Sequence, residues 1–478
     1  MATAFLNYID GRPVESRETA PDINPSNTAD VVGEFARASR KDLDDAIAAA
    51  RQAFPAWSKT TPQTRFDVLD KAGAEILTRK DELGKQLARE QGKPVADGVM
   101  EAVRAGMIFK FFAGEALRMT GDRVDSTRPG VDVEVTREPL GVIAAITPWN
   151  FPLAIAAWKL APALAFGNTV VFKPAELVPW SPWAIADIVQ RAGLPAGVLN
   201  LVMGPGSVIG PALASSADVD AVTFTGSQDV GPSVAAAAVA AGSRVQLEMG
   251  GKNPLVVVDD ADLAIAVNIA VNGAFFQAGQ RCTASSRIIV TEGIHDRFVE
   301  AMVERIKKLV IDDALKPGID IGPCVDGKQL EKNLSYVEIA KKEGGKLVVG
   351  GERLKRDTDG FYMAPALFTE TTADMRINKE EVFGPVASVT RVKNYDEALA
   401  VANATPYGLS AGIATTSLKY ARDFKRNSSS GLVMVNLPTA GIDYHVPFGG
   451  RKKSSYGPRE QGSYAKDFYT VIKTAYTG

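Results

Sequence analysis

The sequence is poor in the residues that build disulfide frameworks and metal sites. Its 478 residues include only two cysteines, Cys282 and Cys324, and two histidines, His295 and His445. So few cysteines exclude a disulfide framework and indicate a reducing compartment, so we expect a cytoplasmic protein. Two isolated histidines and two isolated cysteines cannot form a zinc site of the usual spacing, and we expect no metal. His295 stands near the start of a predicted amphipathic helix, where we expect it to cap the helix at the surface.

An excess of charge of either sign is also missing. The 54 basic and 56 acidic residues leave a formal net charge of −2, so the electrostatic signature of a nucleic-acid or anionic-membrane protein is absent. No apolar run approaches the roughly 20 residues that span a bilayer, and the first residues lack the basic and apolar regions of a signal peptide. We therefore expect a small-molecule substrate and neither a nucleic-acid nor a membrane partner.

What the sequence does contain is an alternation of short apolar runs and helical segments. Residues 39–120 are mostly helical in pattern, beginning with Ser39 as an N-cap, and 132–138 alternates like a solvent-facing strand. From residue 141, apolar strands alternate with helices, which predicts a doubly wound parallel sheet ended by the run 254–260. A second α/β block follows, with expected strands at 286–292, 346–351, 385–392, 409–415, 431–436 and 467–476.

Two glycine-rich turns follow strands of the first block and open helices. They are GPGSVIG, 204–210, and FTGSQDVG, 224–231. Neither is a P-loop, and the first misses the dinucleotide fingerprint by one spacing. Gly226 and Gly231 would let the backbone approach a pyrophosphate, with Ser227 and the amino end of the helix as donors. A plain strand–helix turn explains either segment as well.

Three side chains have surroundings that suit them to catalysis. Cys282 lies among small and polar neighbours in FFQAGQRCTASS, where Arg281 is expected to favour its thiolate. Glu248 ends an apolar strand before a double glycine, and burial there would raise its pKa and suit it as a general base. The amide of Asn150, in ITPWNFP, is placed to donate to an oxyanion. The plain alternatives are a buried small hydrophobe, a strand-end ion pair and a turn before Pro152.

The joint order of seven motifs resembles the aldehyde dehydrogenase superfamily. They are TPWNFP, VFKPAE, FTGS-x3-G, LEMGGKNP, GQRC, EVFGPV and PFGG-x-K, and the match runs from about residue 6 to the end of the chain. The resemblance implies a doubly wound cofactor domain, an α/β catalytic domain and a small bridging β-flap. Their implied bounds are 1–119 with 141–251, 252–460, and 120–140 with 461–478.

The bridging flap has a consequence for assembly. A flap of two strands, near 132–138 and 468–476, is not stable alone. The resemblance therefore implies pairing with another subunit, and we expect a homodimer or a homotetramer.

The same resemblance implies roles for residues of this chain. Cys282 matches the nucleophile that attacks the aldehyde carbon, and the Asn150 amide with the backbone N–H of Cys282 would hold the oxyanion. Hydride then passes to the nicotinamide, and Glu248 matches the base that activates water to hydrolyse the thioester. The implied catalytic residues are Asn150, Lys173, Glu248 and Cys282, and the implied cofactor residues are Ile146, Thr147, Pro148, Trp149, Lys173, Glu176, Gly206, Gly210, Phe224, Gly226, Ser227, Gly231, Glu248, Gly250, Glu381 and Phe383.

The KPAE motif bears on the choice of cofactor. Lys173 and Glu176 can both reach the adenosine ribose hydroxyls, and a carboxylate there repels a 2′-phosphate. NAD is therefore the predicted cofactor, with NADP possible, and relatives with serine in place of Glu176 resemble NADP users.

The substrate is predicted from the tunnel and the end of the chain. Succinate-semialdehyde enzymes of this family carry arginine where this chain has Trp158, which counts against that substrate. The ending has Ser455 and Pro458 where the commoner ending has glycine and arginine, and it is similar to the branch of α-ketoglutaric semialdehyde (2,5-dioxopentanoate) dehydrogenases. That substrate carries a carboxylate, for which Arg104 and Arg281 are the candidate cations. The other expected tunnel residues are Phe151, Ile155, Trp158, Thr283, those around 109–115 and the loop 437–446.

Other functions stay open. The alternative substrates are succinate semialdehyde and a neutral aromatic aldehyde, for which Trp158 and Phe151 would form an apolar slot. Glu248 argues against a CoA-acylating relative, because direct hydrolysis uses such a base. The fold also permits a catalytically silent binding or structural protein, although Cys282 and Asn150 are intact.

Overall fold

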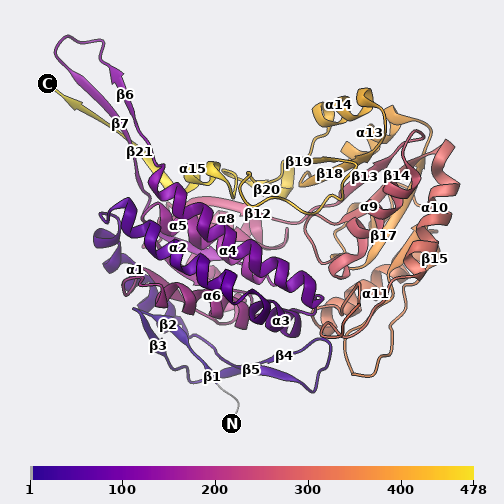
Figure 1. Ribbon diagram of the computed structural model, residues 1–478, viewed down its shortest axis with the longest axis horizontal. Helices are drawn as coiled ribbons and strands as arrows, with labels where there is room; N and C mark the ends of the chain where they lie inside the picture. Colours follow the sequence, from indigo (N-terminus) through magenta and orange to yellow (C-terminus); the bar gives the residue numbers. More distant parts are fainter. Residues whose placement is uncertain (1–3) are drawn as a thin grey trace.

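The computed structural model describes residues 4–478, which form two large and two small β-sheets with helices around them. Figure 1 shows the molecule as two lobes, each built around one large sheet. A small sheet projects from the first lobe as an arm, and the carboxyl terminus lies near its tip. The α/β organisation expected from the sequence is therefore confirmed.

The first large sheet is doubly wound, as the alternation of strands and helices predicts. Its strands are β2 Asn7–Ile9, β3 Arg12–Val14, β8 Val142–Ile146, β9 Thr169–Lys173, β10 Leu199–Leu201, β11 Ala221–Thr225, β12 Arg244–Glu248 and β20 Ser455–Tyr456. Five parallel strands run in the order β12-β11-β8-β9-β10, so the winding reverses beside β8. Antiparallel strands flank them, β20 beside β12, and β2 then β3 beside β10.

Helices cover both faces of this sheet. They are α1 Arg40–Trp57, α2 Pro62–Thr78, α3 Lys80–Gln91, α4 Val95–Leu117, α5 Pro152–Ala165, α6 Trp180–Arg191, α7 Gly206–Ala214 and α8 Gly231–Ala240. The predicted cap of α1 is confirmed, because the side chains of Ser39 and Asp42 each accept a hydrogen bond from the other's backbone amide.

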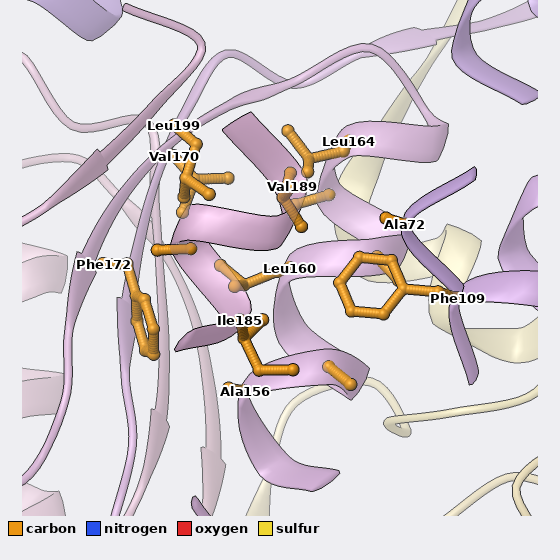
Figure 2. Close-up of a cluster of buried hydrophobic side chains, with 14 of the residues drawn as sticks. Ala72, Phe109, Ala156, Leu160, Leu164, Val170, Phe172, Ile185, Val189 and Leu199 are labelled. Atoms are coloured by element: carbon orange, nitrogen blue, oxygen red, sulfur yellow. The ribbon is translucent and has the colours of Figure 1, made fainter. Parts of the chain in front are cut away.

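Helix α5 lies in the core of the first lobe and is buried along its whole length. It contacts α4, α6 and β9. Figure 2 shows Leu160 of α5 near Ile185 of α6, with Phe172 of β9 and Phe109 of α4 to either side. Burying each such side chain contributes about 1.5–3 kcal/mol. This packing anchors the helix whose first turn follows Asn150.

The second large sheet contains strands β13 Asn253–Val257, β14 Ser285–Thr291, β15 Lys346–Val349, β16 Ala366–Thr369, β17 Val386–Val392, β18 Ser410–Ala414 and β19 Leu432–Val435. Their order is β15-β16-β17-β14-β13-β18-β19, and only β15 is antiparallel to its neighbour. The prediction that 254–260 ends the first block is wrong, because Gly250 and Gly251 carry the chain across and β13 pairs with β14 and β18. Strand β16 has no predicted counterpart, since four residues are too few to show a period.

The helices of the second lobe are α9 Leu263–Phe275, α10 Glu292–Lys307, α11 Gly327–Lys342, α12 Arg376–Lys379, α13 Tyr395–Asn403 and α14 Leu418–Asn427, and α15 Lys466–Tyr469 follows near the carboxyl end. The expectation that His295 is a surface cap is wrong. Its side chain lies on the inward face of α10 with Phe298 and Met302, and the residue is 4% exposed. Spacings of three and seven residues place these side chains on one face of the helix.

The arm is a sheet of β6 Asp122–Asp125, β7 Asp132–Pro139 and β21 Thr470–Thr477, in which β7 is the central strand. Strands were predicted at the positions of β7 and β21 but not at β6. The other small sheet contains β1 Ala4–Phe5, β4 Thr19–Ile23 and β5 Val31–Ala36, and none of these was predicted. Within residues 4–478, no helix combines the length and the apolar character needed to cross a membrane.

Candidate active site

A cavity of about 820 Å³ opens where strands β8, β9, β11 and β12 end, and residues of the second lobe close its other side. Doubly wound sheets bind ligands at this edge, where the winding reverses. All four predicted catalytic residues line the cavity, and so do all the predicted cofactor residues except Gly231. The cavity therefore brings together most of the residues that the motifs singled out, although their roles remain predictions.

The loop before Cys282 has an unusual backbone. It contains the short helical turn Phe276–Gly279, in which Gln277, Ala278 and Gly279 have φ angles of 55°, 54° and 65°. Left-handed conformations are costly for residues other than glycine and persist only where the surroundings enforce them. This turn redirects the chain after α9 and places Cys282 at the wall of the cavity.

The thiol of Cys282 is not activated in the way the sequence suggested. Burial, together with the carboxylates of Glu381 and Glu248, raises the pKa of Cys282 to about 12, although the backbone amides of Cys282 and Thr283 act in the opposite direction. Arg281 and Cys282 do attract each other electrostatically, as predicted, but burial outweighs this contribution. The guanidinium of Arg281 donates to backbone carbonyls at the end of α9. The thiol form therefore dominates at neutral pH, and reaction requires removal of its proton.

Asn150 lies directly beside the loop of Cys282. Its Nδ2 donates one hydrogen bond to the carbonyl oxygen of Gln280, at 3.1 Å. An amide nitrogen carries two protons, so a second N–H remains available. Because Asn150 also lines the cavity, this donor is placed where an oxyanion at the carbon attached to Cys282 would need it.

A buried ion pair that the sequence did not reveal holds the backbone around Asn150. Lys93 Nζ lies 2.5 Å from Glu101 Oε2 and donates to the carbonyl oxygen of Asn150 at 2.7 Å. The other carboxylate oxygen of Glu101 accepts from the amides of Leu153 and Ala154, at 2.9 and 3.1 Å. Glu101 therefore caps the start of α5, whose Phe151 cap position offers no side-chain hydrogen bond.

Glu248 ends β12 and faces the cavity from the first lobe. Its Oε2 accepts a hydrogen bond from Ser455 Oγ at 2.5 Å. Burial and the nearby charge of Glu460 raise the pKa of Glu248 well above its ordinary value, while Ser455 and Lys159 oppose the shift. Lys159 is itself fully buried and paired with Glu460. A raised pKa of this kind agrees with the predicted role of Glu248 as a general base.

Asn253 is a second residue near the site that the sequence did not single out. Its Nδ2 donates to the carbonyl oxygens of Cys282 and Ala284, at 2.7 and 3.0 Å, and its Oδ1 accepts from the amide of Ser410 at 3.0 Å. These bonds fix the backbone that follows Cys282. Its place at the end of LEMGGKNP, shortly after Glu248, is the only local signal.

The part of the cavity beside α7 and α8 fits a dinucleotide. A Cβ atom added at Gly210 would meet nothing within 4 Å, so the helix surface is open there. Gly226 and Ser227 line the cavity before the amino end of α8, where backbone donors favour a phosphate. Gly231 does not line it; a Cβ there would lie 2.2 Å from Met249 Sδ, so this glycine serves close packing of the helix.

Lys173 and Glu176 lie together near the start of α7. Glu176 Oε1 accepts from the amide of Gly206 at 2.6 Å. Burial lowers the pKa of Lys173, and the charge of Glu176 opposes the shift. Apolar side chains of α8, including Val234 and Ala237, line the adjacent wall. A ribose beside Lys173 and Glu176, with its base against this apolar wall, agrees with these surroundings.

The nicotinamide end of such a dinucleotide would face the second lobe. Glu381 Oε1 accepts from the amide of Gly251 at 3.0 Å, and burial raises the pKa of Glu381 to about 7. The rings of Trp149 and Phe383 meet edge to face, with centroids 5.2 Å apart. These residues come from different lobes, so a dinucleotide here would bridge both.

The predicted substrate residues divide into two groups. Ile155 and Trp158 line the cavity, as does Phe448, whose ring stacks on Trp158 with centroids 5.3 Å apart. The other four, Phe151, Thr283, Arg281 and Arg104, do not line the cavity. The ring of Phe151 lies under Lys93 Nζ, and the carbonyl oxygen of Thr283 accepts a hydrogen bond from Thr439. Arg281 donates to the end of α9, and Arg104 lies over the Trp158 ring.

Comparison with known proteins gives matches along nearly the whole chain. The model of the aldehyde dehydrogenase family matches residues 13–475. An α-ketoglutaric semialdehyde dehydrogenase of Bacillus subtilis (strain 168) is 44% identical over 476 residues, which cover 99% of this chain and 98% of that protein. An α-ketoglutarate semialdehyde dehydrogenase of Haloferax volcanii is 44% identical over 483 residues, covering 100% and 99%.

Solved structures agree with the sequence matches. The crystal structure of betaine aldehyde dehydrogenase from Staphylococcus aureus in complex with NAD+ has a TM-score of 0.97 and 35% identity, covering 99% of this chain and 94% of that chain. The family resemblance and the fold class inferred from the motifs are thus confirmed. The chain belongs to the aldehyde dehydrogenase family and is an aldehyde-oxidising enzyme.

Proposed function

We propose that this enzyme oxidises α-ketoglutaric semialdehyde to 2-oxoglutarate, with NAD as the preferred cofactor and with hydrolysis of an enzyme thioester. The observation that carries the chemistry is that Cys282, Glu248 and Asn150 line one cavity at the edge of a doubly wound sheet. The aldehyde is proposed from relatives named for it, which are 44% identical over nearly the full length. An NAD+ complex of a structure with a TM-score of 0.97 supports the cofactor.

In this proposal the protein's own groups carry the covalent steps. Cys282 loses its proton to water, and its Sγ adds to the aldehyde carbon, whose oxygen becomes an oxyanion held by the Asn150 amide and the Cys282 N–H. NAD, when bound, supplies the hydride acceptor that leaves the acyl group as a thioester. Glu248 then takes a proton from water, whose oxygen attacks the thioester carbon and displaces the thiolate.

A panel of aldehydes tests the proposal. We expect kcat/KM for α-ketoglutaric semialdehyde to exceed that for succinate semialdehyde or benzaldehyde by at least about tenfold, since a matched polar group outweighs size alone. NADH should appear without CoA. A strict requirement for CoA would instead identify an acylating enzyme, and absence of turnover with every aldehyde would identify a silent protein.

Replacing Glu176 with serine should move the enzyme toward NADP. The carboxylate that accepts from the Gly206 amide would no longer repel a 2′-phosphate, so we expect the NADP/NAD ratio of kcat/KM to rise by about tenfold or more. Steady-state rates with each cofactor measure the ratio. Glu304→Ser on the exposed face of α10 is the control and should leave it unchanged. A ratio that does not move would remove Glu176 from cofactor selection.

We also propose a division of the chain into a cofactor domain (1–119 and 141–251), a catalytic domain (252–460) and a flap (120–140 and 461–478). The strands of each proposed domain belong to the same sheets, which supports this division. The exception is β20, which lies within 252–460 but pairs with β12 of the cofactor domain. The flap's outer strand β21 exposes Ile472 and Tyr476, which supports a homodimer or homotetramer. Two free cysteines support a cytoplasmic location.

A further inference from the structure

Three buried hydrogen-bond donors that lack acceptors lie together around Trp158, of which only Trp158 lines the cavity. Trp158 lines the cavity and is 5% exposed, and its Nε1 has no partner within residues 4–478. Arg104 of α4 lies over the Trp158 ring, with its guanidinium carbon 5.6 Å from the ring centroid. Its Nε is also buried, with no acceptor in the described part of the chain.

Gln461 completes the group. It is fully buried, and its Oε1 accepts a hydrogen bond from Arg104 Nη2 at 3.2 Å. This bond turns the amide so that its Nε2 is left buried, and no described residue accepts from it. The three donors come from α4, from α5 and from the segment after β20, so they are distant in sequence and meet only in the folded protein.

The group also carries a positive charge without a direct counterion. No carboxylate of residues 4–478 forms an ion pair with Arg104; the charges of Glu101, Cys282 and Asp443 act on it only through space. The guanidinium stays charged at neutral pH.

Unpartnered buried donors destabilise a folded protein unless a ligand or water accepts from them. Three such donors beside one charge, with no competing acceptor, select an anionic group rich in oxygen. The other candidate cation, Arg281, also leaves a buried Nε without an acceptor in the described part of the chain. Its Nη2, however, donates to two backbone carbonyls, those of Asn272 and Gly273, whereas Arg104 Nη2 donates to one side-chain oxygen.

We propose that Arg104, Gln461 and Trp158 donate hydrogen bonds to the carboxylate of the substrate and to the ketone oxygen beside it. These bonds would make the enzyme selective for aldehydes of 2-oxo acids. This inference rests on the proposed function. α-Ketoglutaric semialdehyde carries its aldehyde at one end and a ketone next to the carboxylate at the other, so three oxygens meet three donors. Succinate semialdehyde offers the carboxylate alone, and an aromatic aldehyde offers neither.

The test compares α-ketoglutaric semialdehyde with pentanal, a neutral aldehyde of the same carbon count, through the ratio of their kcat/KM values with NAD. Arg104→Met removes the charge, Gln461→Glu replaces the free donor by a carboxylate at constant size, and Trp158→Phe removes only the indole N–H. We expect the ratio to fall about 100-fold for Arg104→Met and about tenfold for each of the other two. Arg118→Met, at the exposed end of the same helix, is the control and should leave the ratio and both rates unchanged.

The outcomes separate this inference from the proposed function. A wild-type enzyme that does not prefer the keto acid contradicts the proposed substrate. A wild type that prefers it, with variants that keep the ratio within about twofold, means that water alone satisfies these donors and overturns the subsite while the substrate stands. Thermal unfolding identifies a variant that fails to fold, and Gln461→Glu and Trp158→Phe, which conserve size and ring, then decide the question.

Discussion

Replacing Cys282 with alanine is expected to lower kcat for aldehyde oxidation by at least about 10⁴-fold, because no second thiol among residues 4–478 lines the cavity to form the covalent intermediate. The other cysteine, Cys324, is buried away from it, and burial raises the pKa of Cys324 to about 12. Steady-state NADH formation measures the loss. NAD affinity, followed by quenching of tryptophan fluorescence, should be nearly unchanged.

Cys324→Ala is the matched control for the loss of a thiol. Its sulfur accepts a hydrogen bond from Asn333 at 3.3 Å within the second lobe, so this variant should cost stability but keep turnover. A Cys282→Ala enzyme that still oxidised aldehydes at a measurable fraction of the normal rate would contradict the proposed chemistry at its first step.

Changing Glu248 to glutamine should separate the two halves of the reaction. Acylation of Cys282 needs no water, whereas release of the acid needs a base, so we expect kcat to fall about 10²- to 10⁴-fold. Rapid mixing should still show a burst of about one NADH per active site, because the block follows hydride transfer. Hydroxylamine, which attacks thioesters without a general base, should restore part of the turnover. A variant without a burst would show that Glu248 also acts before hydride transfer.

Ser455 supplies a finer test of the same carboxylate. Its hydroxyl donates to Glu248 Oε2 and so lowers a pKa that burial and Glu460 raise. Only the ionised carboxylate can accept a proton, so hydrolysis is lost as the pH falls through the pKa of Glu248 in the folded enzyme. Ser455→Ala is expected to raise that pKa further. In a plot of kcat against pH, the fall in kcat on the acidic side should therefore occur at higher pH in the variant than in the wild type. A limb that stays in place would remove Ser455 from control of the base.

Much of the site could be predicted because its signals are local. The buried parallel strands are short apolar runs between helices, and their carboxyl ends meet at one edge whatever the rest of the chain does. Glu248 stands at such an end, before a double glycine, and Cys282 lies among small neighbours. Each segment made its residue a candidate, and the joint order of the seven motifs then favoured the catalytic interpretation over the plain structural one.

The supports of these residues left no such signal. Lys93 and Glu101 hold Asn150 and the chain after it through a backbone carbonyl and two helix amides. Asn253 fixes the carbonyl of Cys282 in the same way. Any residue can supply a backbone group, so no pattern of residue types marks these contacts, and only the path of the folded chain creates them.

The two candidate arginines show the limit most clearly. Arg281 is the neighbour of Cys282 in sequence, but its side chain turns away and donates to the end of α9. Arg104, far away in sequence, lies over Trp158 with a free donor. The sequence by itself determined the family and the doubly wound sheet and predicted the reacting groups, because periodicity and motifs are properties of short segments. Only the tertiary structure decided which groups each charge meets, because hydrogen-bond partners are set by packing between elements that are distant in the chain.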